Sequence, residues 1–192
     1  MAPGEGTASS EEKKAPRVVD LEGPDRERAV PALKDGFTGI YRWHAKRTLR
    51  TATRVRAIVL DGQVVAVSVL ERLDPQVGYV YYLATALGHR RKGLGRRLLD
   101  DAIELFRREG VAVVYGAAEE ENAPSVALFL SRGFRVVQRK ERSYRDGGLG
   151  AWGLRSRMTL VGGELLFGRR LVPHEPSEAA LGRETGDPTD TG

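Results

Sequence analysis

The chain has 192 residues, no cysteine, three scattered histidines and a formal net charge of +5 at pH 7. This length suffices for one domain with a well-buried core, while the missing cysteines exclude disulfides, thiol nucleophiles and Cys-ligated zinc. No apolar run approaches the roughly 20 residues that cross a bilayer, and the N-terminus lacks an apolar secretory segment; we therefore expect a cytoplasmic protein that does not enter the membrane.

The two ends of the chain differ in composition from its middle. Residues 1–16 and 173–192 are rich in Gly, Ser, Glu, Pro and Thr, so they cannot bury enough apolar area to offset the entropy of ordering. We predict two disordered tails around a single domain at 17–172. Both tails are net acidic, which leaves the domain more basic than the whole chain and favours anionic partners. The single asparagine and the excess of Arg over Lys are typical of a thermophile or a GC-rich genome.

The first half of the domain carries clear periodic patterns and turn signals. Apolar residues at helical spacing predict an amphipathic helix, and an Asp-Gly dipeptide between two β-branched runs predicts a hairpin. The expected elements are, in order, a strand at 17–21, a helix from Pro24 to about Lys34 that ends at Gly36, a helix from Phe37 to about Thr53, strands at 55–60 and 63–71 joined by Asp61-Gly62, and a Tyr-rich central strand at 78–86.

The second half continues with alternating helices and strands. We expect a helix that begins after residue 93 and is closed by Gly110, a buried strand at 111–117, a short helix from near Asn122 to Gly133, and a last strand pair within 134–144 and 156–161. This order predicts an α/β sandwich rather than a regularly alternating, doubly wound sheet.

The stretch "GHRRKGLGRRLL" at 88–99 is a candidate anion site. A Walker loop needs Lys and then Ser or Thr after its second glycine, where this chain has Leu94-Gly95. A dinucleotide fingerprint needs a third glycine, where this chain has Leu98. What remains is a basic turn with two glycines at a helix start, and such a turn binds an anion through free amides and the helix dipole. A pyrophosphate is the natural occupant; a plain basic helix start is the alternative.

This arrangement resembles the GNAT superfamily of acyl-CoA-dependent N-acetyltransferases. The family's acetyl-CoA loop reads Arg/Gln-x-x-Gly-x-Gly/Ala after a central strand, and this chain has Arg90-Arg91-Lys92-Gly93-Leu94-Gly95. Downstream, "VAVVYGAAEEENAPSVALFLSRGF" supplies the family's strand, its Asn and its short helix ending in Gly-Phe. The resemblance covers about residues 17–160. It implies a mixed, mostly antiparallel central sheet with splayed central strands, flanked by helices.

The resemblance also implies where acetyl-CoA would bind. The backbone of the central strand would pair with the pantetheine arm, and one of its N–H groups would hold the thioester oxygen. Residues 90–96 would take the pyrophosphate, and Asn122 would face the pantetheine or the thioester unless it serves only as a helix N-cap. The implied contacts are Leu83, Ala84, Thr85, Arg90, Arg91, Lys92, Gly93, Leu94, Gly95, Arg96, Asn122 and Phe129.

The chain departs from the family at two catalytic positions. Many members have a Tyr at the position of Phe129 that protonates the leaving sulfur. A thiol has an ordinary pKa near 8.5, so a CoA thiolate leaves without full proton transfer. Ser125, one helical turn earlier, is a candidate donor, with an ordinary exposed serine as the alternative.

Some members also use a Glu five residues before the Asn as the base, where this chain has Ala117. A base must still take a proton from the acceptor amine. The candidates are Glu119 or Glu120, Tyr81 or Tyr82 through water, and Glu71. We prefer Glu71 because it ends a strand beside the expected cleft; a surface salt bridge is its alternative role.

On the substrate side, residues 36–56 contain several arginine and lysine residues and no acidic residue. Arg42, Lys46, Arg50 and Arg54 are spaced by four, so they would line one face of a helix that continued that far. Such a face is solvated, binds the CoA 3′-phosphate, or binds an acidic acceptor such as a nucleic acid or acidic peptide. The candidate substrate residues are Tyr41, Arg42, Lys46 and Arg50.

Together these features predict an enzyme that moves an acetyl group from acetyl-CoA directly to an acceptor amine. A protein or peptide, a polyamine and an RNA base are all compatible acceptors. No residue suits a covalent acetyl-enzyme, because cysteine is absent and no Ser-His pair is evident. The alternative function is a basic nucleic-acid-binding module on an acetyl-CoA-binding fold with weakened catalysis.

Overall fold

The computed structural model describes residues 16–36, 39–137, 158 and 163–171 of the chain. The predicted disordered tails lie outside these residues, apart from Pro16, and so does most of the strand expected within 156–161. In the described ranges no helix is both long and apolar enough to cross a membrane. The cytoplasmic location and the thermophilic origin stay predictions from composition.

A seven-stranded sheet forms the centre of the domain, with the order β1-β2-β3-β4-β5-β7-β6. Only β4 and β5 pair in parallel, and all other neighbours are antiparallel. The mixed, mostly antiparallel sheet predicted from the resemblance is therefore confirmed. The strands are β1 (Arg17–Asp20), β2 (Arg54–Leu60), β3 (Gln63–Asp74), β4 (Val77–Thr85), β5 (Val113–Glu119), β6 (Arg135–Val136) and β7 (Glu164–Arg170).

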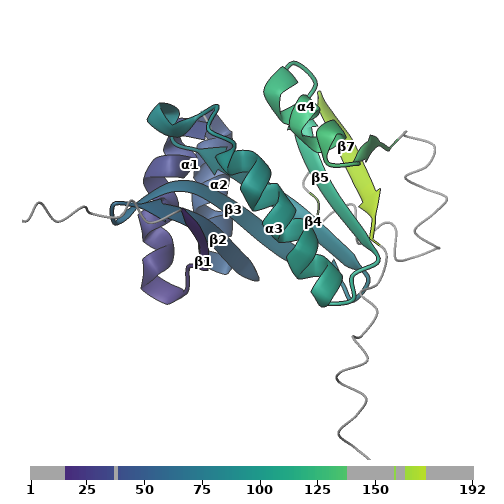
Figure 1. Ribbon diagram of the computed structural model, residues 1–192, viewed down its shortest axis with the longest axis horizontal. Coiled ribbons are helices and arrows are strands. Elements are labelled where there is room, and N and C mark those ends of the chain that lie inside the picture. The colour runs from purple at the N-terminus through teal and green to yellow at the C-terminus, as the bar shows by residue number, and fades with distance from the viewer. Residues whose placement is uncertain (1–15, 37–38, 138–157, 159–162, 172–192) are drawn as a thin grey trace, which may run out of the picture.

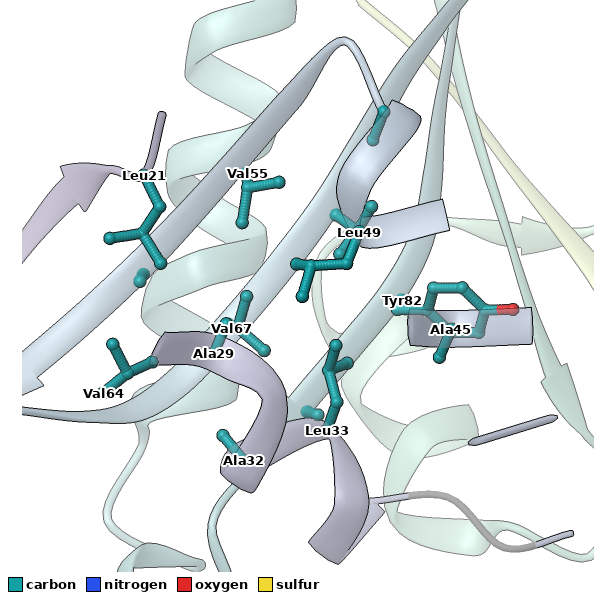
Figure 2. Close-up of a cluster of buried hydrophobic side chains, with 14 residues drawn as sticks. Leu21, Ala29, Ala32, Leu33, Ala45, Leu49, Val55, Val64, Val67 and Tyr82 are labelled. Carbon is teal, nitrogen blue, oxygen red and sulfur yellow. The ribbon is translucent and has the colours of Figure 1, made fainter. Parts of the chain in front are cut away.

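Helices cover both faces of this sheet (Figure 1). One face carries the 3-10 helix η1 (Gly23–Ala29), α1 (Val30–Gly36) and α2 (Gly39–Thr51), whose apolar side chains pack on β2, β3 and β4 around Leu49, Val55 and Val67 (Figure 2). The other face carries α3 (Leu94–Arg108) and α4 (Ala123–Ser131). A short 3-10 turn, η2 (Leu87–His89), connects β4 to the loop before α3.

The helix expected from Pro24 to Lys34 is divided into η1 and α1. Val30 donates its backbone N–H to Glu27, three residues earlier, as in a 3-10 helix. Pro31 follows and has no N–H to give to the same carbonyl, while Val30 itself has α-helical angles of φ −55° and ψ −42°. The helix expected over this stretch is therefore present, as a 3-10 segment that continues directly into α1.

The second helix ends at Thr51, before Arg54. The Arg26 guanidinium donates to the carbonyls of Leu49, Arg50 and Ala52, which satisfies the end of the helix. Arg54 instead begins β2. A longer helix would have carried four evenly spaced basic residues on one face. Because α2 ends at Thr51, the last of them, Arg54, does not belong to that face.

The last strand, β7, was not predicted. It pairs with β5 along its whole length, from Val113 opposite Arg170 to Glu119 opposite Glu164. Its apolar run is short and contains Gly168, which weakens a strand signal. A Cβ atom on Gly168 would lie 2.9 Å from the Tyr115 ring, so this glycine marks a close approach of two strands.

Candidate active site

The site begins where β4 and β5 separate. Their pairing runs from Val77 opposite Val113 to Val80 opposite Gly116 and ends there, although β4 continues to Thr85 and β5 to Glu119. Figure 1 shows β5 running toward α4, whereas β3 and β4 run toward α1 and α2. The splayed central strands expected from the resemblance are thus present, and the splay begins after Val80.

A β-bulge lies at the start of the splay. Leu70 on β3 is opposite Val80, and its neighbour Val69 is opposite Tyr82, so that β4 accommodates Tyr81 as an extra residue. A bulge changes which face the following side chains take. Val80 accordingly packs with the α3 side chains, whereas Tyr82 packs with those of α1 and α2.

A cavity of about 220 Å³ occupies the space between the separated strands. Its walls include Tyr82 from the α1 and α2 face and Leu128 from the α4 face, so the cavity passes between the two faces of the sheet. Seven of the residues considered for the site from the sequence meet at this cavity: Tyr81, Tyr82, Leu83, Glu119, Asn122, Ser125 and Phe129.

Two further residues predicted for the acetyl-CoA contacts lie at the end of β4. The Ala84 side chain is buried among those of α1 and α2 and does not line the cavity. Thr85 lies beside the start of α3, where its Oγ1 would be 3.8 Å from a Cβ atom on Gly95. Only backbone atoms of Ala84 therefore suit the predicted contact.

The loop before α3 has the backbone that an anion site requires. Gly93 is the N-cap of α3 at φ +76°, and Arg91 also has a left-handed φ of +61°. No side chain caps the helix, which leaves its first amides without that kind of partner. Arg91, Lys92 and Arg96 are exposed, and none of them forms an ion pair with a described residue.

Arg90 fastens this loop to the neighbouring elements. Its Nε donates to the Thr85 carbonyl at 3.3 Å and its Nη2 to the Asp35 carbonyl. The Asp35 carboxylate also accepts the Leu87 backbone N–H at 3.0 Å. Arg90 therefore joins the end of β4, the end of α1 and the loop before α3, a role that the sequence motif did not indicate.

Asn122 and Phe129 belong to α4, which borders the cavity. The Asn122 side chain caps this helix by accepting the Ser125 backbone N–H at 3.2 Å, and it also lines the cavity. The Phe129 ring stacks on Phe167 at 5.0 Å and meets Phe134 edge to face at 5.1 Å. This aromatic group makes an apolar wall at the position where the resemblance led us to expect a tyrosine.

Glu71, the base preferred from the sequence, does not line the cavity. Its carboxylate accepts hydrogen bonds from the backbone N–H and the hydroxyl of Thr53, at the start of β2. It lies on β3, and β4 separates β3 from β5 in the sheet. The structure therefore places Glu71 opposite Tyr79 of β4 and outside the cavity that Tyr81 and Ser125 line.

Three other carboxylates line the cavity: Asp35 at the end of α1, Glu119 at the end of β5 and Glu164 at the start of β7. Glu119 and Glu164 lie directly opposite each other on neighbouring strands. Glu119 is one of the alternative bases expected from the sequence, whereas no role was expected for Asp35 or Glu164. Glu164 lies far along the chain, in a strand that was not predicted, and no motif marks it.

Tyrosines from β4 gather on the side of the sheet opposite α3. The Tyr79 and Tyr81 rings meet edge to face at 4.7 Å, and Tyr81 and Tyr82 lie 6.1 Å apart. Tyr79 donates its hydroxyl to the Met158 carbonyl, and burial, reinforced by the negative charge of Glu164, raises the pKa of Tyr79. The Tyr82 hydroxyl lies 2.7 Å from Nδ1 of His44, a residue of α2 to which no role was given from the sequence.

Three arginines of the basic segment expected on the substrate side are paired with acids. Arg50 bonds to Glu27 at 2.7 Å, and this hydrogen bond lowers the pKa of Glu27. The last two arginines of the segment are paired too, Arg54 with Glu109 and Arg56 with Asp20 and Asp101. Lys46 is exposed, while the side chains of Tyr41 and Arg42 lie outside the described part of α2.

Residues 16–134 match the model of the acetyltransferase (GNAT) family. The chain is 38% identical over 77 residues to the mycothiol acetyltransferase of Beutenbergia cavernae, a match that covers 40% of this chain and 26% of that protein. It is 34% identical over 89 residues to the N-alpha-acetyltransferase RimI of Mycobacterium tuberculosis, covering 46% of this chain and 54% of that protein. The chain therefore spans about half, or less, of the curated relatives it matches.

The fold is also similar to that of a solved acetyltransferase. The crystal structure of the ribosomal-protein-S18-alanine N-acetyltransferase from Escherichia coli superposes with a TM-score of 0.62, covering 84% of this chain and 97% of that one. Sequence identity in this comparison is 19%, so the similarity concerns the fold.

Proposed function

Because the chain belongs to the GNAT acetyltransferase family, we propose that it transfers an acetyl group from acetyl-CoA to an amine. The observation that carries this proposal is the cavity between the separated ends of β4 and β5, with a basic, uncapped helix start beside it. Acetyl-CoA, when bound, supplies the acetyl group as an activated thioester.

The residues around the splay fit that ligand. Past Val80 the backbone of β4 is not paired with β5, which leaves this edge of Leu83, Ala84 and Thr85 available to the pantetheine arm. The left-handed Gly93 and the first amides of α3 suit a pyrophosphate, and the exposed Arg91, Lys92 and Arg96 add positive charge beside them. Asn122 and Phe129 would border the thioester end of the ligand, because both line the cavity.

The acceptor that suits this cavity is a cationic amine. Among the described lining residues the only charged side chains are the carboxylates of Asp35, Glu119 and Glu164. Tyr81 and Tyr82 line the same space, and tyrosine rings attract cations. A polyamine or a lysine-containing peptide therefore fits better than an RNA base or an acidic peptide, whose negative charges the carboxylates would repel.

Three side chains remain candidates for catalysis. Tyr81 lines the cavity at the bulge, where its ring suits contact with the acceptor. Ser125 lines the cavity one helical turn before Phe129 and is a candidate donor to the leaving sulfur. Glu71 stays the base predicted from the sequence, although its place outside the cavity favours another route for the proton.

A turnover screen tests the proposed function. Release of CoA from acetyl-CoA is measured with spermidine, a lysine-rich peptide, a glutamate-rich peptide and a short RNA. We expect kcat/KM to be at least about tenfold higher for the two cationic acceptors, since one carboxylate or cation–π contact of about 1.4 kcal/mol accounts for that ratio. Raising the salt concentration should reduce this preference, because salt screens exposed charges.

Two results would contradict the proposal. Equal turnover with the acidic peptide would exclude a cationic acceptor. Binding of RNA with a steep salt dependence, but no turnover of any amine, would favour the nucleic-acid-binding alternative. RNA binding without turnover is the less expected result. Arg50, Arg54 and Arg56 form ion pairs with acidic residues, which leaves fewer basic side chains available for phosphates.

A further inference from the structure

A tyrosine–histidine pair connects the cavity with the outer side of α2. Tyr82 is 8% exposed and lines the cavity, and its hydroxyl lies 2.7 Å from His44 Nδ1. The two rings meet edge to face with centroids 6.4 Å apart. His44 itself is half-buried, and Thr48 places its hydroxyl 3.3 Å from the same nitrogen, one helical turn further on. The pair thus extends from the cavity wall to a residue of α2 that is partly exposed.

The bulge in β4 makes this contact possible. With Tyr81 inserted opposite the Val69–Leu70 step, Tyr82 is directed to the α1 and α2 face instead of the α3 face. Figure 2 shows the Tyr82 ring beside Ala45, the residue that follows His44 in α2. The feature that opens the cleft therefore also brings Tyr82 to His44.

The charges of the cavity make a proton route necessary. Carboxylates near an ammonium group favour its charged form, so Asp35, Glu119 and Glu164 would bind a cationic acceptor and also keep it protonated. Only the neutral nitrogen, with its lone pair, can attack a thioester. Besides these three carboxylates, the cavity wall offers Tyr82, whose hydroxyl contacts an imidazole nitrogen, as a route for that proton.

Two other ionisable side chains, one on β4 and one on β3, already form hydrogen bonds with residues that do not line the cavity. Tyr79 donates its hydroxyl to the Met158 carbonyl, and burial raises its pKa, which disfavours its use as a base. Glu71 accepts both of its hydrogen bonds from Thr53 outside the cavity. The Tyr82 hydroxyl, in contrast, belongs to a lining residue and contacts an imidazole nitrogen.

We propose that Tyr82 and His44 form a proton relay for the acceptor amine, an inference that rests on the proposed function. Tyr82 contacts the acceptor, and His44 acts through Tyr82. The ammonium nitrogen gives one proton to the Tyr82 oxygen as Tyr82 gives its own proton to His44 Nδ1. The imidazolium then releases its Nε2 proton to water.

The remaining steps balance the transfer. The nitrogen lone pair forms the new N–C bond while the C–S bond of the thioester breaks and its electron pair stays on sulfur. As the amide forms, the nitrogen loses a second proton, and the CoA thiolate takes up one proton. These two protons cancel in the overall balance. One proton per turnover therefore reaches solvent, and no oxidant or reductant is involved.

Four variants, one of them a control, test this relay in the full chain, with spermidine and acetyl-CoA as substrates. Tyr82→Phe removes only the hydroxyl, and His44→Asn keeps a polar group near the position of Nδ1 but cannot carry a proton. Tyr79→Phe is the matched control, because it removes a buried hydroxyl from the same strand that contacts a carbonyl. CoA binding is measured by calorimetry and thermal stability by a melting scan.

We expect kcat to fall about 100-fold in Tyr82→Phe and in His44→Asn, the lower end of what a positioned acid or base contributes. Affinity for CoA and the KM for acetyl-CoA should stay unchanged, and Tyr79→Phe should keep kcat within about twofold while it melts at a lower temperature. In His44→Ala, added imidazole should restore kcat, which a purely structural role of His44 would not allow.

Full kcat in both variants would overturn the relay while leaving the proposed function intact. A loss of kcat that is matched by lost CoA binding, without rescue of His44→Ala by imidazole, would assign the pair a structural role instead. Binding of CoA without turnover of any amine by the unmodified protein would remove both proposals. Should Tyr82→Phe fail to fold, the rescue experiment still decides.

Discussion

The loop at 90–96 and the cavity beside it carry side chains of opposite charge. Arg91, Lys92 and Arg96 surround the start of α3, whereas the cavity is lined by Asp35, Glu119 and Glu164. The whole chain has a formal charge of +5, which favoured anionic partners when only the sequence was considered. The distribution of charge is more informative than its sum, because the bases lie where a cofactor phosphate fits and the acids lie where an amine fits.

The two regions also differ in how they are assembled. The loop is built from consecutive residues, together with the helix that follows it. The cavity instead combines the end of α1, the splayed parts of β4 and β5, the start of β7 and α4. A change in the loop should therefore act on cofactor binding, and a change at the carboxylates of the cavity should act on acceptor binding.

The largest effect is expected for Gly93→Glu. This change places a side chain at φ +76° and a negative charge at the proposed pyrophosphate site. Two like charges about 4 Å apart interact by about 4 kcal/mol near a protein surface, so affinity for CoA should fall at least about 100-fold in calorimetry.

Gly110→Glu is the matched control for this change. Gly110 has φ +73° just beyond the opposite end of α3, and no neighbouring atom lies within 4 Å of the position that a Cβ atom would take there. The strain and the added charge are therefore similar, at a distance of more than about 20 Å along the helix. Equal losses of CoA affinity in the two variants would contradict a phosphate site at the loop.

A smaller effect is expected for Glu164→Gln, which removes one of the carboxylates that line the cavity. Loss of one carboxylate should raise the KM for spermidine about tenfold and change kcat less, because the carboxylate binds the cation rather than moving its proton. The KM for acetyl-CoA should stay the same. Steady-state kinetics with both substrates varied measures the two constants separately.

Glu71→Gln accompanies that experiment as the test of the base predicted from the sequence. Since Glu71 contacts Thr53 outside the cavity, its amide variant should keep full turnover from about pH 6 to pH 9. If Glu71→Gln loses turnover and Glu164→Gln does not, the acceptor site lies on the β3 side and the division between the two regions is wrong.

The smallest effect is expected for Phe129→Tyr, at the boundary between the two regions. The change adds a hydroxyl to the apolar wall formed with Phe134 and Phe167. It should alter kcat by less than about threefold, because a thiol with an ordinary pKa near 8.5 leaves without a donor. Phe129→Leu, which lacks the hydroxyl, reports on packing alone. A rise in kcat of tenfold or more would mean that protonation of the sulfur limits the reaction.

Analysis of the sequence predicted the elements in which local patterns are strong. The Asp61-Gly62 turn joins β2 and β3 with both residues at positive φ, and α3 follows the loop as expected from its apolar stripe. The first helix is also present, although its first part is a 3-10 helix. The expectation failed at β7, where Gly168 weakens the strand signal.

Several of the residues expected at the candidate site line the cavity, whereas Glu71 does not. Tyr81, Leu83, Asn122, Ser125 and Phe129 lie together at the cavity because they belong to two segments whose order the motif specifies. Glu71 was expected beside the cleft because it lies near the end of a strand. The neighbouring Thr53 and the strand order place it elsewhere, and neither follows from the residues around Glu71.

Local sequence thus determined the family, the strand–loop–helix unit for the cofactor and the missing tyrosine at Phe129, because these depend on residues close together in the chain. The acidic cavity and the His44–Tyr82 contact were decided by the tertiary structure. Their members come from five elements between α1 and β7. They meet only because the β4 bulge and the splay of β4 from β5 direct their side chains to one space, and pairing between distant strands leaves no periodic signal in the sequence.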